Sequence, residues 1–413
     1  MSYIDLKYRP RNDVVCDFSV EPVTRFNIEQ LAAESSVGTW TELHTTKPYM
    51  QKLAAKVFSV RGKDVKVAYP LSLFEPGNIP NLLSSVAGNV FGLGSLKNLR
   101  LNDISLPESY VRSFRGPTFG VQGVRKLLRV KKRPLVGTII KPKLGLRTAD
   151  HAKVAYDAWV GGCDLVKDDE NLSSQAFNPF QKRVIETLKM RDKAERETGE
   201  RKMYMANITA ETNEMIKRAK FVKSHGGEYV MVDMFTCGFS ALQTLRDENL
   251  GLVIHAHRAM HAAITRNPKH GISMLVFAKL ARLAGVDQIH IGTAVGKMEG
   301  GRAEVEELET EMEKGIVMPN AKNHVLAQKW YHLKPVLAVC SGGLHPGLVP
   351  KLVKMLGNDI VIQMGGGIHW NPRGTKYGAM AARQAVDAVV EGISLKEYAK
   401  THRELKEALD KFR

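Results

Sequence analysis

The sequence is poor in cysteine and contains no long apolar run. Four cysteines occur in 413 residues (Cys16, Cys163, Cys237 and Cys340), and none is close enough to another for a CxxC pair. This spacing argues against a disulfide scaffold or a zinc ribbon and predicts a protein of the reducing cytoplasm. No stretch approaches the roughly 18 apolar residues that a membrane helix needs. The first ten residues lack the apolar segment of a secretory signal, so we expect no membrane association.

Acidic residues are scarce relative to basic ones. Lys and Arg number 60 against 43 Asp and Glu, which gives a formal net charge of +17. Three interpretations are open: binding of nucleic acid, attraction of a small polyanionic substrate, or a solvated surface. The densest basic patch, residues 125–133, is short, and no zinc-finger, basic-zipper or RNA-binding motif accompanies it. A hydrophobic content of 44% excludes a disordered chain.

The first 134 residues mix strand and helix patterns. Residues 14–22 alternate as a strand does, and residues 26–36 read as the start of a helix. Residues 54–70 predict two strands joined by a turn at RGKD, and residues 78–92 are apolar at helical spacing. We therefore predict an N-terminal α+β domain over residues 1–134.

From residue 135 onward short apolar runs alternate with amphipathic segments. Continuous apolar runs are typical of parallel strands buried on both faces, and eight of them occur: residues 134–140, 163–167, 203–209, 229–233, 251–257, 287–292, 335–341 and 359–365. Helical periodicity follows, for example from Thr148 and over residues 212–226. Eight such units in this length predict a (β/α)8 TIM barrel over residues 135–413.

Polar and glycine residues follow seven of these runs, where a barrel places its active site. Lys141 and Lys143 follow the first run, and Lys167, Asp169 and Glu170 end or follow the second. The acids are candidate Mg²⁺ ligands, or alternatively the acids of a helix N-terminus. The lysines are candidate acids or bases because burial lowers a lysine pKa, although lysines are usually surface charges. Asp168 alternates with its neighbours and is expected to point away.

Histidines and glycines follow the later runs. The HxHRxxH segment at 255–261 fits a zinc site, or equally a neutral His base beside Arg258 as an anion clamp. The SGG and GGG turns after the seventh and eighth runs match the phosphate site of barrels, although plain glycine turns are also common.

Together these segments closely resemble the large subunit of ribulose-1,5-bisphosphate carboxylase/oxygenase (RuBisCO). The resemblance covers nearly the whole chain. It rests on GTIIKPKLGL (137–146), GGCDLVKDDEN (161–171), HAHRAMHA (255–262), HIGTAVGKMEG (290–300), SGG (341–343), QMGGG (363–367), AAESSVGTW (32–40), AYPLSLFE (68–75) and GNVFG (88–92). It implies a ferredoxin-like N-terminal domain and carboxylation, with competing oxygenation, of ribulose 1,5-bisphosphate to two 3-phosphoglycerate through a Mg-stabilised enediolate.

The resemblance also implies roles for individual residues. Lys167 would form a carbamate with an activating CO₂, bind Mg²⁺ with Asp169 and Glu170, and act as a base. Lys141 and His257 would transfer protons, and Lys297, on a closing loop, would orient CO₂. The implied substrate-binding residues are Lys143, Arg258, His290, Ser341, Gly342, Gly343, Gln363, Gly365, Gly366, Glu34, Thr39, Trp40 and Asn89. Of these, Arg258, His290 and Ser341 would hold one phosphate, and Gly343, Gly365, Gly366, Thr39 and Trp40 the other.

The family implies an obligate homodimer, because the N-terminal domain of one subunit completes the barrel site of its partner. The short chain and GTWTELHTTKP (38–48) resemble the archaeal form III group, which implies AMP salvage and no small subunit. Ile139 departs from the Thr of many members, which removes one expected hydrogen bond to substrate. A RuBisCO-like enolase or isomerase acting on a thio-sugar phosphate is the alternative, but such proteins usually lose the loop lysine that is present here. Nucleic-acid binding becomes remote.

Overall fold

The computed structural model describes residues 2–39, 41, 43–295 and 301–412. The chain forms two compact units. One, here called the ferredoxin-like unit, contains Met1–Gly116, Met260–Ala284 and Lys314–Leu333; the other, the barrel unit, contains Pro117–Ala259, Gly285–Glu313 and Lys334–Arg413. Residues 117–134 thus group with the barrel, and two later segments group with the first 116 residues.

The ferredoxin-like unit is built on a five-stranded sheet in the order β10-β4-β1-β3-β2. Its elements are β1 (Asp13–Glu21), α1 (Arg25–Glu34), β2 (Lys56–Arg61), β3 (Asp64–Pro70), α2 (Ile79–Val86), β4 (Asn98–Ser105), α3 (Glu108–Arg112), α10 (Ala262–Thr265), β10 (Gly271–Ile272), α11 (Met274–Ala284), β12 (Ile316–Val317) and β13 (Gln328–Lys329). Strands β1 to β4 pair antiparallel in the order 4-1-3-2, with α1 and α2 between them in the chain. This βαββαβ arrangement confirms the predicted ferredoxin-like fold.

One helix of this unit is shorter than its apolar pattern predicts. Helix α2 ends at Val86, and a separate 3₁₀ turn covers Asn89–Gly92. The backbone turns between them at Gly88, where an added Cβ would lie 2.0 Å from the carbonyl oxygen of Ser84. Periodicity alone could not show this break, because apolar residues continue on both sides of it.

The barrel unit contains a closed ring of eight parallel strands, as predicted. In ring order the strands are β11 (Gln288–His290), β14 (Leu337–Ser341), β15 (Ile360–Gln363), β5 (Leu135–Ile139), β6 (Leu165–Lys167), β7 (Met203–Asn207), β8 (Tyr229–Asp233) and β9 (Val253–His257). Each lies inside one of the eight predicted apolar runs. Their residues are almost all buried, because the barrel interior covers one face and helices cover the other.

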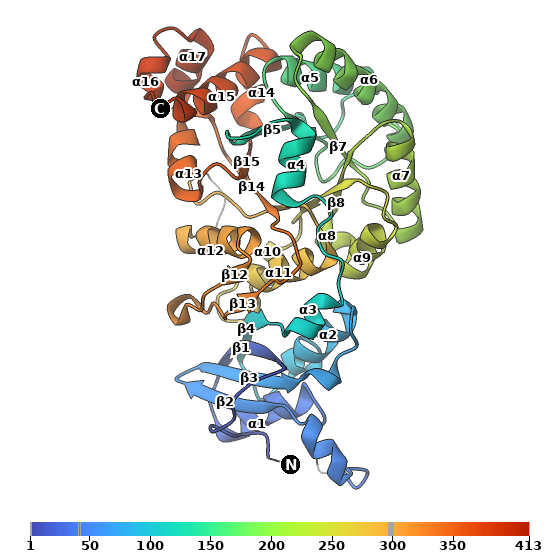
Figure 1. Cartoon of the computed structure of the whole chain (residues 1–413), viewed down its shortest axis with the longest axis vertical. Coiled ribbons are helices and arrows are strands. Elements are labelled where there is room, and N and C mark those ends of the chain that lie inside the picture. Colours follow the sequence, from blue (N-terminus) through green and yellow to red (C-terminus); the bar gives the residue numbers. More distant parts are fainter. Residues whose placement is uncertain (1, 40, 42, 296–300, 413) are drawn as a thin grey trace. The chain divides into compact units, whose positions relative to one another are not determined.

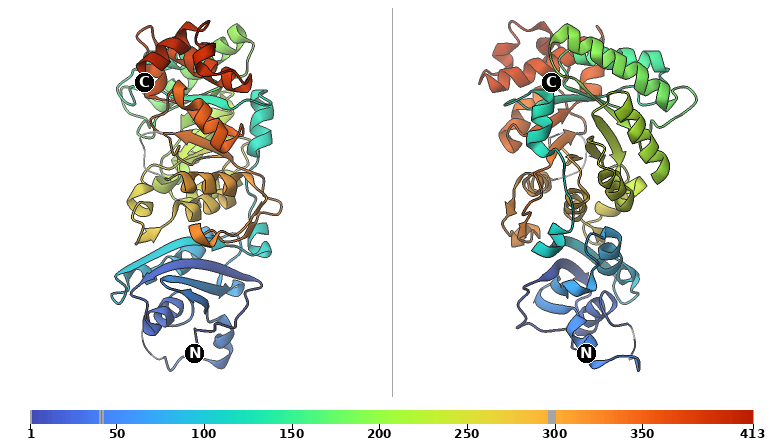
Figure 2. Two further views of the ribbon diagram at one scale, coloured as in Figure 1. Left: turned by 90° about the vertical axis from the view of Figure 1, so that its left-hand side faces the viewer. Right: turned by 45° about the vertical axis from the view of Figure 1, so that its right-hand side comes forward.

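Helices alternate with the strands along the chain (Figure 1). Those of the barrel unit are α4 (Gly120–Leu128), α5 (Thr148–Val160), α6 (Phe180–Thr198), α7 (Thr212–Ser224), α8 (Met234–Cys237), α9 (Phe239–Asp247), α12 (Arg302–Glu313), α13 (Val349–Leu356), α14 (Gly366–His369), α15 (Thr375–Val390), α16 (Leu395–Tyr398) and α17 (Arg403–Lys411). In the right-hand view of Figure 2 the green helices α6 and α7 lie on the outside of the strands. No helix in the described part of the chain is long and apolar enough to cross a membrane.

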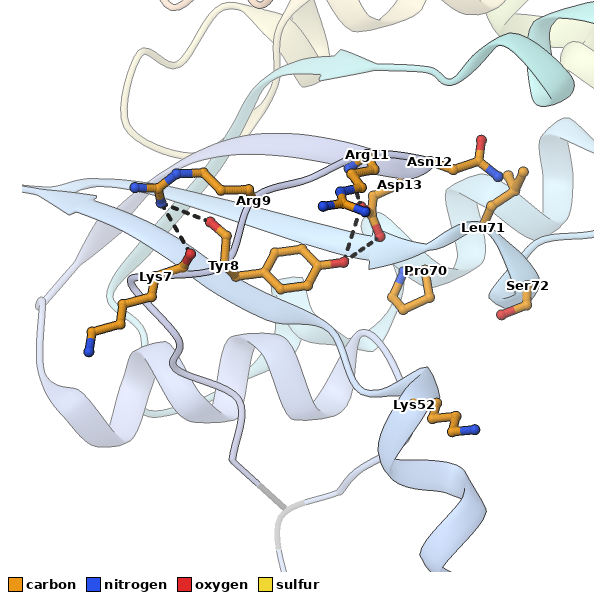
Figure 3. A pocket seen from close by; sticks show the side chains of 10 residues that line it. All are labelled: Lys7, Tyr8, Arg9, Arg11, Asn12, Asp13, Lys52, Pro70, Leu71 and Ser72. Carbon is orange, nitrogen blue, oxygen red and sulfur yellow. Dashed lines mark hydrogen bonds between the residues drawn. The ribbon is translucent and has the colours of Figure 1, made fainter.

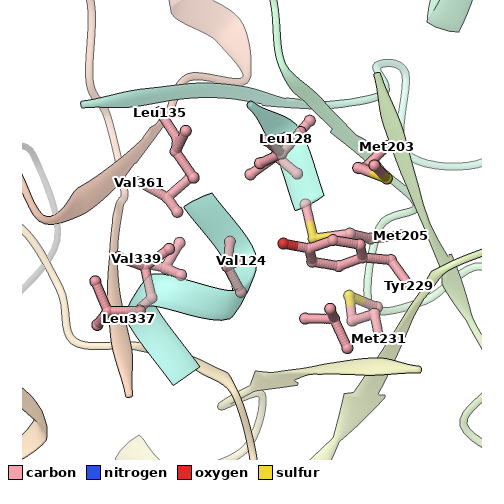
Figure 4. Close-up of a cluster of buried hydrophobic side chains, with 13 residues drawn as sticks. Val124, Leu128, Leu135, Met203, Met205, Tyr229, Met231, Leu337, Val339 and Val361 are labelled. Atoms are coloured by element: carbon pink, nitrogen blue, oxygen red, sulfur yellow. The ribbon is translucent and has the colours of Figure 1, made fainter. Parts of the chain in front are cut away.

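Helix α4 closes one end of the barrel. Its Val124 and Leu128 pack against side chains from the first residues of the strands, including Leu135, Tyr229 and Leu337 (Figure 4). Asp287 fixes the start of this helix, because its Oδ1 accepts hydrogen bonds from the backbone N–H groups of residues 119 and 120. The amino ends of the strands are therefore sealed by apolar packing, which leaves the carboxyl ends for a site.

Candidate active site

The carboxyl ends of the strands bring together most of the barrel residues that the sequence singles out. Lys141 follows β5, Lys167 ends β6, His257 ends β9 and Ser341 ends β14. Parallel strands all point the same way in the ring, so these side chains meet at one mouth of the barrel. All four residues belong to the barrel unit.

Lys167 is an almost completely buried lysine, with a relative exposure of 1%. Its Nζ donates to the carbonyl oxygen of Asp168 at 2.7 Å and lies 3.1 Å from the sulfur of Met231. Burial lowers the pKa of Lys167, and the charges of Asp169 and Asp233 oppose that shift. This is not a surface lysine but an amine held partly toward its neutral, nucleophilic form.

Asp169 and Glu170 follow Lys167 after one intervening residue, and no helix begins there. The next helix, α6, starts at Phe180, so these acids do not cap a helix N-terminus. Lys141 forms an ion pair with Asp169. The Nζ of Lys143 lies 3.5 Å from Glu170 Oε1. Two lysines from the segment after β5 therefore face two acids from the segment after β6.

The two acids are close enough to shift each other's pKa. Burial raises the pKa of Glu170, and the hydrogen bond and negative charge of Asp169 raise it further. Burial alone would raise the pKa of Asp169, but hydrogen bonds with Glu170 and Lys141 outweigh it and lower the pKa to about 2. Paired carboxylates with crowded negative charge are a donor set that fits a hard divalent cation.

A third anionic ligand is missing from the described residues. No group of three His, Cys, Asp or Glu residues in the described part of the chain is placed to hold a metal ion. Lys167 lies beside the two acids in the sequence but is cationic or neutral unless it is modified. The residues present fit a divalent cation if Lys167 becomes an anion, which is the chemistry that the resemblance implies.

Asp168 points away from the site, as expected from alternation. Its Oδ1 accepts a hydrogen bond from the Tyr204 hydroxyl at 2.6 Å, and its Oδ2 accepts from Arg183 Nε at 3.2 Å. His151 Nε2 lies 3.1 Å from Oδ1. All four side chains are buried. Asp168 therefore anchors the loop that carries Asp169 and Glu170 rather than facing a ligand.

Asp233 is a site residue that the sequence reasoning missed. It ends β8, its Oδ1 lies 2.9 Å from His257 Nδ1, and burial raises its pKa to about 6. The same His257 nitrogen accepts from the backbone N–H of Ala259 at 3.2 Å. Its position in the sequence could have identified it, because Asp233 is the polar residue that ends the fourth apolar run. His257 is thus held by its Nδ1 side, and burial lowers its pKa well below the usual range.

Arg258 lies partly buried next to Gly292, where an added Cβ would be 2.9 Å from the guanidinium. Within the described ranges, Arg258 has no carboxylate at ion-pair distance and donates no hydrogen bond to a protein group. Burial lowers its pKa, and Glu304 opposes the shift. A cation held without a protein partner is a place for an anionic ligand group.

His255 and His290 lie deeper in the barrel and contact each other. Their Nε2 atoms are 2.9 Å apart. The second ring nitrogen of His255 is 3.0 Å from Gln288 Oε1, and that of His290 is 2.6 Å from Ser341 Oγ. Both nitrogens of His255 are therefore engaged, which leaves none for the zinc site that the HxHRxxH spacing left open.

The glycine segments follow β14 and β15. Gly342 and Gly343 have φ values of 121° and 71°, a left-handed conformation that other residues rarely adopt. An added Cβ at Gly365 would lie 3.2 Å from Lys141 Cε, so the missing side chain makes room for this lysine. Gly366 begins α14 and is exposed.

Gln363, at the end of β15, is 1% exposed, and neither atom of its amide has a hydrogen-bond partner. An unpartnered buried amide costs about 1–3 kcal/mol. This is consistent with a group that a polar ligand completes.

The remaining predicted residues lie in the ferredoxin-like unit or outside the described residues. Glu34, Thr39 and Asn89 belong to the ferredoxin-like unit, where the Thr39 hydroxyl donates to Glu34 Oε1 at 3.3 Å. Trp40 and Lys297 lie outside the described residues.

Ile139 stands where many members of the family have Thr, and its carbonyl oxygen is 3.0 Å from His369 Nε2. The neighbouring Thr138 hydroxyl donates to the Met364 carbonyl at 2.7 Å, so it is not available to a ligand.

A basic hollow of about 810 Å³ lies on the ferredoxin-like unit (Figure 3). Its lining residues are Lys7, Tyr8, Arg9, Arg11, Asn12, Asp13, Lys52, Pro70, Leu71 and Ser72. Its one carboxylate, Asp13, accepts the Tyr8 hydroxyl, and Arg9 donates to backbone carbonyls of residues 6–8. The hollow accounts for part of the positive charge but has none of the acid–base groups of the barrel mouth.

Comparisons with known proteins show the family of the chain. The family model described as the ribulose bisphosphate carboxylase large chain, catalytic domain, matches residues 120–412, and the model of the N-terminal domain matches residues 2–110. A ribulose bisphosphate carboxylase of Methanocaldococcus jannaschii is 52% identical over 424 aligned positions, covering 99% of each chain. One from Pyrococcus abyssi is 49% identical, covering 100% of this chain and 96% of the relative.

Solved structures show the same similarity. The dimeric archaeal Rubisco from Hyperthermus butylicus has a TM-score of 0.94 at 46% identity, covering 99% of this chain and 98% of that one. The octameric Rubisco from Pyrococcus horikoshii, solved with sulfate, has a TM-score of 0.93 at 48% identity, covering 99% and 96%.

Proposed function

The chain belongs to the ribulose bisphosphate carboxylase large-chain family, and from that premise we propose that it carboxylates ribulose 1,5-bisphosphate at the barrel mouth. The products would be two molecules of 3-phosphoglycerate, and O₂ would compete with CO₂ for the same intermediate. The observation that carries the proposal is the buried Lys167 beside Asp169 and Glu170. Among the described residues no carboxylate lies at ion-pair distance from the Lys167 amine, which suits its modification by CO₂.

An amine reacts with CO₂ only in its unprotonated form, and it releases a proton as the N–C bond forms. Burial shifts Lys167 toward that form. The resulting carbamate would complete a three-anion set with Asp169 and Glu170 and hold Mg²⁺. When bound, the cation would polarise the sugar oxygens and stabilise negative charge developing on them.

The other side chains would bind and orient the substrate. Arg258, without a protein partner among the described residues, would pair with a phosphate. Lys141, between Asp169 and Gly365, would hold or deliver a proton at the reacting carbon. Gln363 would donate and accept hydrogen bonds with its unpartnered amide. His257 would transfer protons through Nε2, because its Nδ1 is already engaged.

We also propose the finer assignment to form III and a role in AMP salvage, in a cytoplasmic protein without a small subunit. The dimeric and octameric archaeal relatives support a homodimer as the smallest active unit, with larger assemblies of dimers possible in this group. Glu34, Thr39, Trp40 and Asn89 of one subunit would then complete the barrel site of the other.

The test is incorporation of radiolabelled bicarbonate with ribulose 1,5-bisphosphate after incubation with CO₂ and Mg²⁺. We expect acid-stable label in 3-phosphoglycerate and none when either activator is omitted. Absence of label from the activated wild-type protein would overturn the proposal, and turnover of a thio-sugar phosphate instead would indicate an enolase or isomerase.

The matched variant is Lys167→Met, which keeps the apolar stem and removes the amine. It should lose label incorporation by at least about a hundredfold, the usual scale for an acid–base group. Its thermal stability should be kept, because the variant no longer buries an amine without a carboxylate at ion-pair distance. Lys143→Met, at an exposed lysine of the same mouth, should retain the CO₂ dependence that Lys167→Met loses.

A further inference from the structure

A continuous chain of hydrogen bonds runs through the barrel from its floor to its mouth. It begins at Tyr229, whose ring belongs to the apolar floor cluster (Figure 4). The Tyr229 oxygen is 3.1 Å from Gln288 Nε2, and Gln288 Oε1 is 3.0 Å from His255 Nδ1. His255 Nε2 is 2.9 Å from His290 Nε2, and His290 Nδ1 is 2.6 Å from Ser341 Oγ. The chain thus links four strands: β8, β11, β9 and β14.

The first four members are closed to solvent. Tyr229, Gln288 and His255 have no exposed surface, and His290 is 3% exposed. Ser341 is only partly buried, because it lies at the mouth. Buried polar groups that are linked in this way have few alternative partners, so each one restricts the protonation of the next.

Both histidines are neutral. Burial lowers the pKa of each well below the usual range, and the positive charge of Lys167 acts in the same direction. A neutral imidazole has one N–H donor and one bare acceptor nitrogen. The direction of a single hydrogen bond therefore sets the direction of all the others.

The amide of Gln288 sets that direction. Its Nε2 donates to the Tyr229 oxygen, so its Oε1 faces His255 and can only accept. His255 must then carry its proton on Nδ1 and accept at Nε2. His290 must donate from Nε2 and accept at Nδ1, and the hydroxyl of Ser341 must donate to that nitrogen.

We infer that Gln288 and His255 are positioning residues that fix His290 as its Nε2–H tautomer and turn the proton of Ser341 inward. Ser341 then presents only lone pairs to the mouth of the barrel. A phosphate oxygen at pH 7 cannot donate to these lone pairs, but a sugar hydroxyl can. With both ring nitrogens engaged, His290 acts on a ligand through Ser341.

This inference deepens the proposed function and rests on it for the identity of the ligand as a sugar phosphate. It assigns Ser341 to a hydroxyl of that sugar, and it leaves Arg258 as the unpartnered cation for the phosphate. The direction of the chain is a property of the ligand-free protein and does not depend on which reaction is catalysed.

Neutron diffraction from a deuterated crystal of the whole protein tests the direction without any activity assay. We expect deuterium on His255 Nδ1 and His290 Nε2, with the Ser341 deuterium pointing at His290. Deuterium on His290 Nδ1 would overturn the inference, because the whole chain would then run the other way and Ser341 would donate to the ligand. This result stands whether or not the protein fixes CO₂.

Two substitutions of Gln288 test the consequence in solution. Gln288→Glu keeps an acceptor opposite His255 Nδ1 and so preserves the direction, whereas Gln288→Leu removes it. Loss of one hydrogen bond should raise KM for ribulose 1,5-bisphosphate about three- to tenfold in Gln288→Leu, with a smaller change in kcat. Gln288→Glu should restore KM to within about twofold of the wild-type value.

Equal KM values in the wild type and Gln288→Leu, or equal impairment of both variants, would overturn the positioning role. If Gln288→Leu does not fold, as judged by circular dichroism, the diffraction result still decides the direction. If the wild-type protein itself incorporates no label, the proposed function fails while the tautomer assignment is unaffected.

Discussion

At the residue scale, the barrel unit contains two buried or partly buried arginines in opposite situations. Arg183 has no exposed side-chain surface and pairs with Asp168 at 3.2 Å, whereas Arg258 has no carboxylate partner among the described residues. Burying an unpaired cation is unfavourable, so an arginine in this situation is expected to have a function that requires its charge. The two residues are a natural matched pair for substitution.

We predict that Arg258→Met raises KM for ribulose 1,5-bisphosphate about 10- to 100-fold, the range of a lost charge-assisted hydrogen bond. Its Tm should be unchanged or higher, because no group in the described part of the chain loses a partner. Steady-state kinetics and thermal denaturation check both expectations. Unchanged KM would remove Arg258 from the phosphate site.

The control is Arg183→Met, which removes the cation that pairs with the buried carboxylate of Asp168. This loss should cost about 3–5 kcal/mol of unfolding free energy. A drop in Tm for Arg258→Met as large as that for Arg183→Met would show that Arg258 is structural.

At the element scale, the sequence predicts the strands well and their partners poorly. The eight apolar runs identify the barrel because each strand is buried on both faces, and chain order alone places Lys141, Lys167 and Ser341 at strand ends. The link between Tyr229 and Gln288 is a side-chain hydrogen bond between residues 59 positions apart, on strands β8 and β11, which β9 separates in the ring. Asp233 is one polar residue at the end of a run, and its role depends on the facing ring of His257.

The packing partner of helix α4, at the floor of the barrel, could not be predicted from the sequence either. Its apolar residues lie before the first barrel run, and sequence patterning attaches them to the N-terminal domain. In the fold they pack against the first residues of the strands. An amphipathic helix does not show in its sequence which apolar surface it will cover.

We predict that Leu128→Ala, in α4, lowers the unfolding free energy by about 2–5 kcal/mol, because Leu128 is 2% exposed in the floor cluster. Denaturant titration measures this loss. The control is Leu127→Ala on the same helix, at a less buried position, which should cost clearly less. Similar losses for the two variants would mean that the cluster does not depend on this face of α4.

A second element-scale prediction concerns acid stability. Glu200, just before β7, pairs with Lys202 Nζ at 2.7 Å and with Arg383 of α15 at 3.2 Å. Burial alone would raise the pKa of Glu200, but these two cations lower it to about 2, from an ordinary 4.5. A carboxyl whose pKa falls on folding contributes stability above its unfolded pKa and loses it as pH falls toward the folded value.

Glu200→Gln should therefore be less stable than the wild type at pH 7. The difference in unfolding free energy should shrink as pH falls from about 4.5 toward 2. Denaturant titrations across this pH range measure it. A difference that stays constant with pH would show that Glu200 is not held ionised by Lys202 and Arg383.

At the scale of the whole molecule, the proposed function requires residues from both compact units. Lys167 lies in the barrel unit, and Asn89 lies in the ferredoxin-like unit. If each active site takes its barrel from one subunit and its Asn89 from the other, two inactive variants can complement each other. If one chain supplies both, they cannot.

We predict that Lys167→Met and Asn89→Ala are each strongly impaired as pure dimers and that refolding them together restores activity. A mixed dimer pairs one intact barrel with one intact partner domain, and its second site carries both defects. Random pairing makes half of the dimers mixed, so about a quarter of all sites should be active. Label incorporation after co-refolding measures this fraction, and separately refolded variants mixed afterwards are the control. Activity no higher than that control would place a complete site within one chain and overturn the obligate dimer.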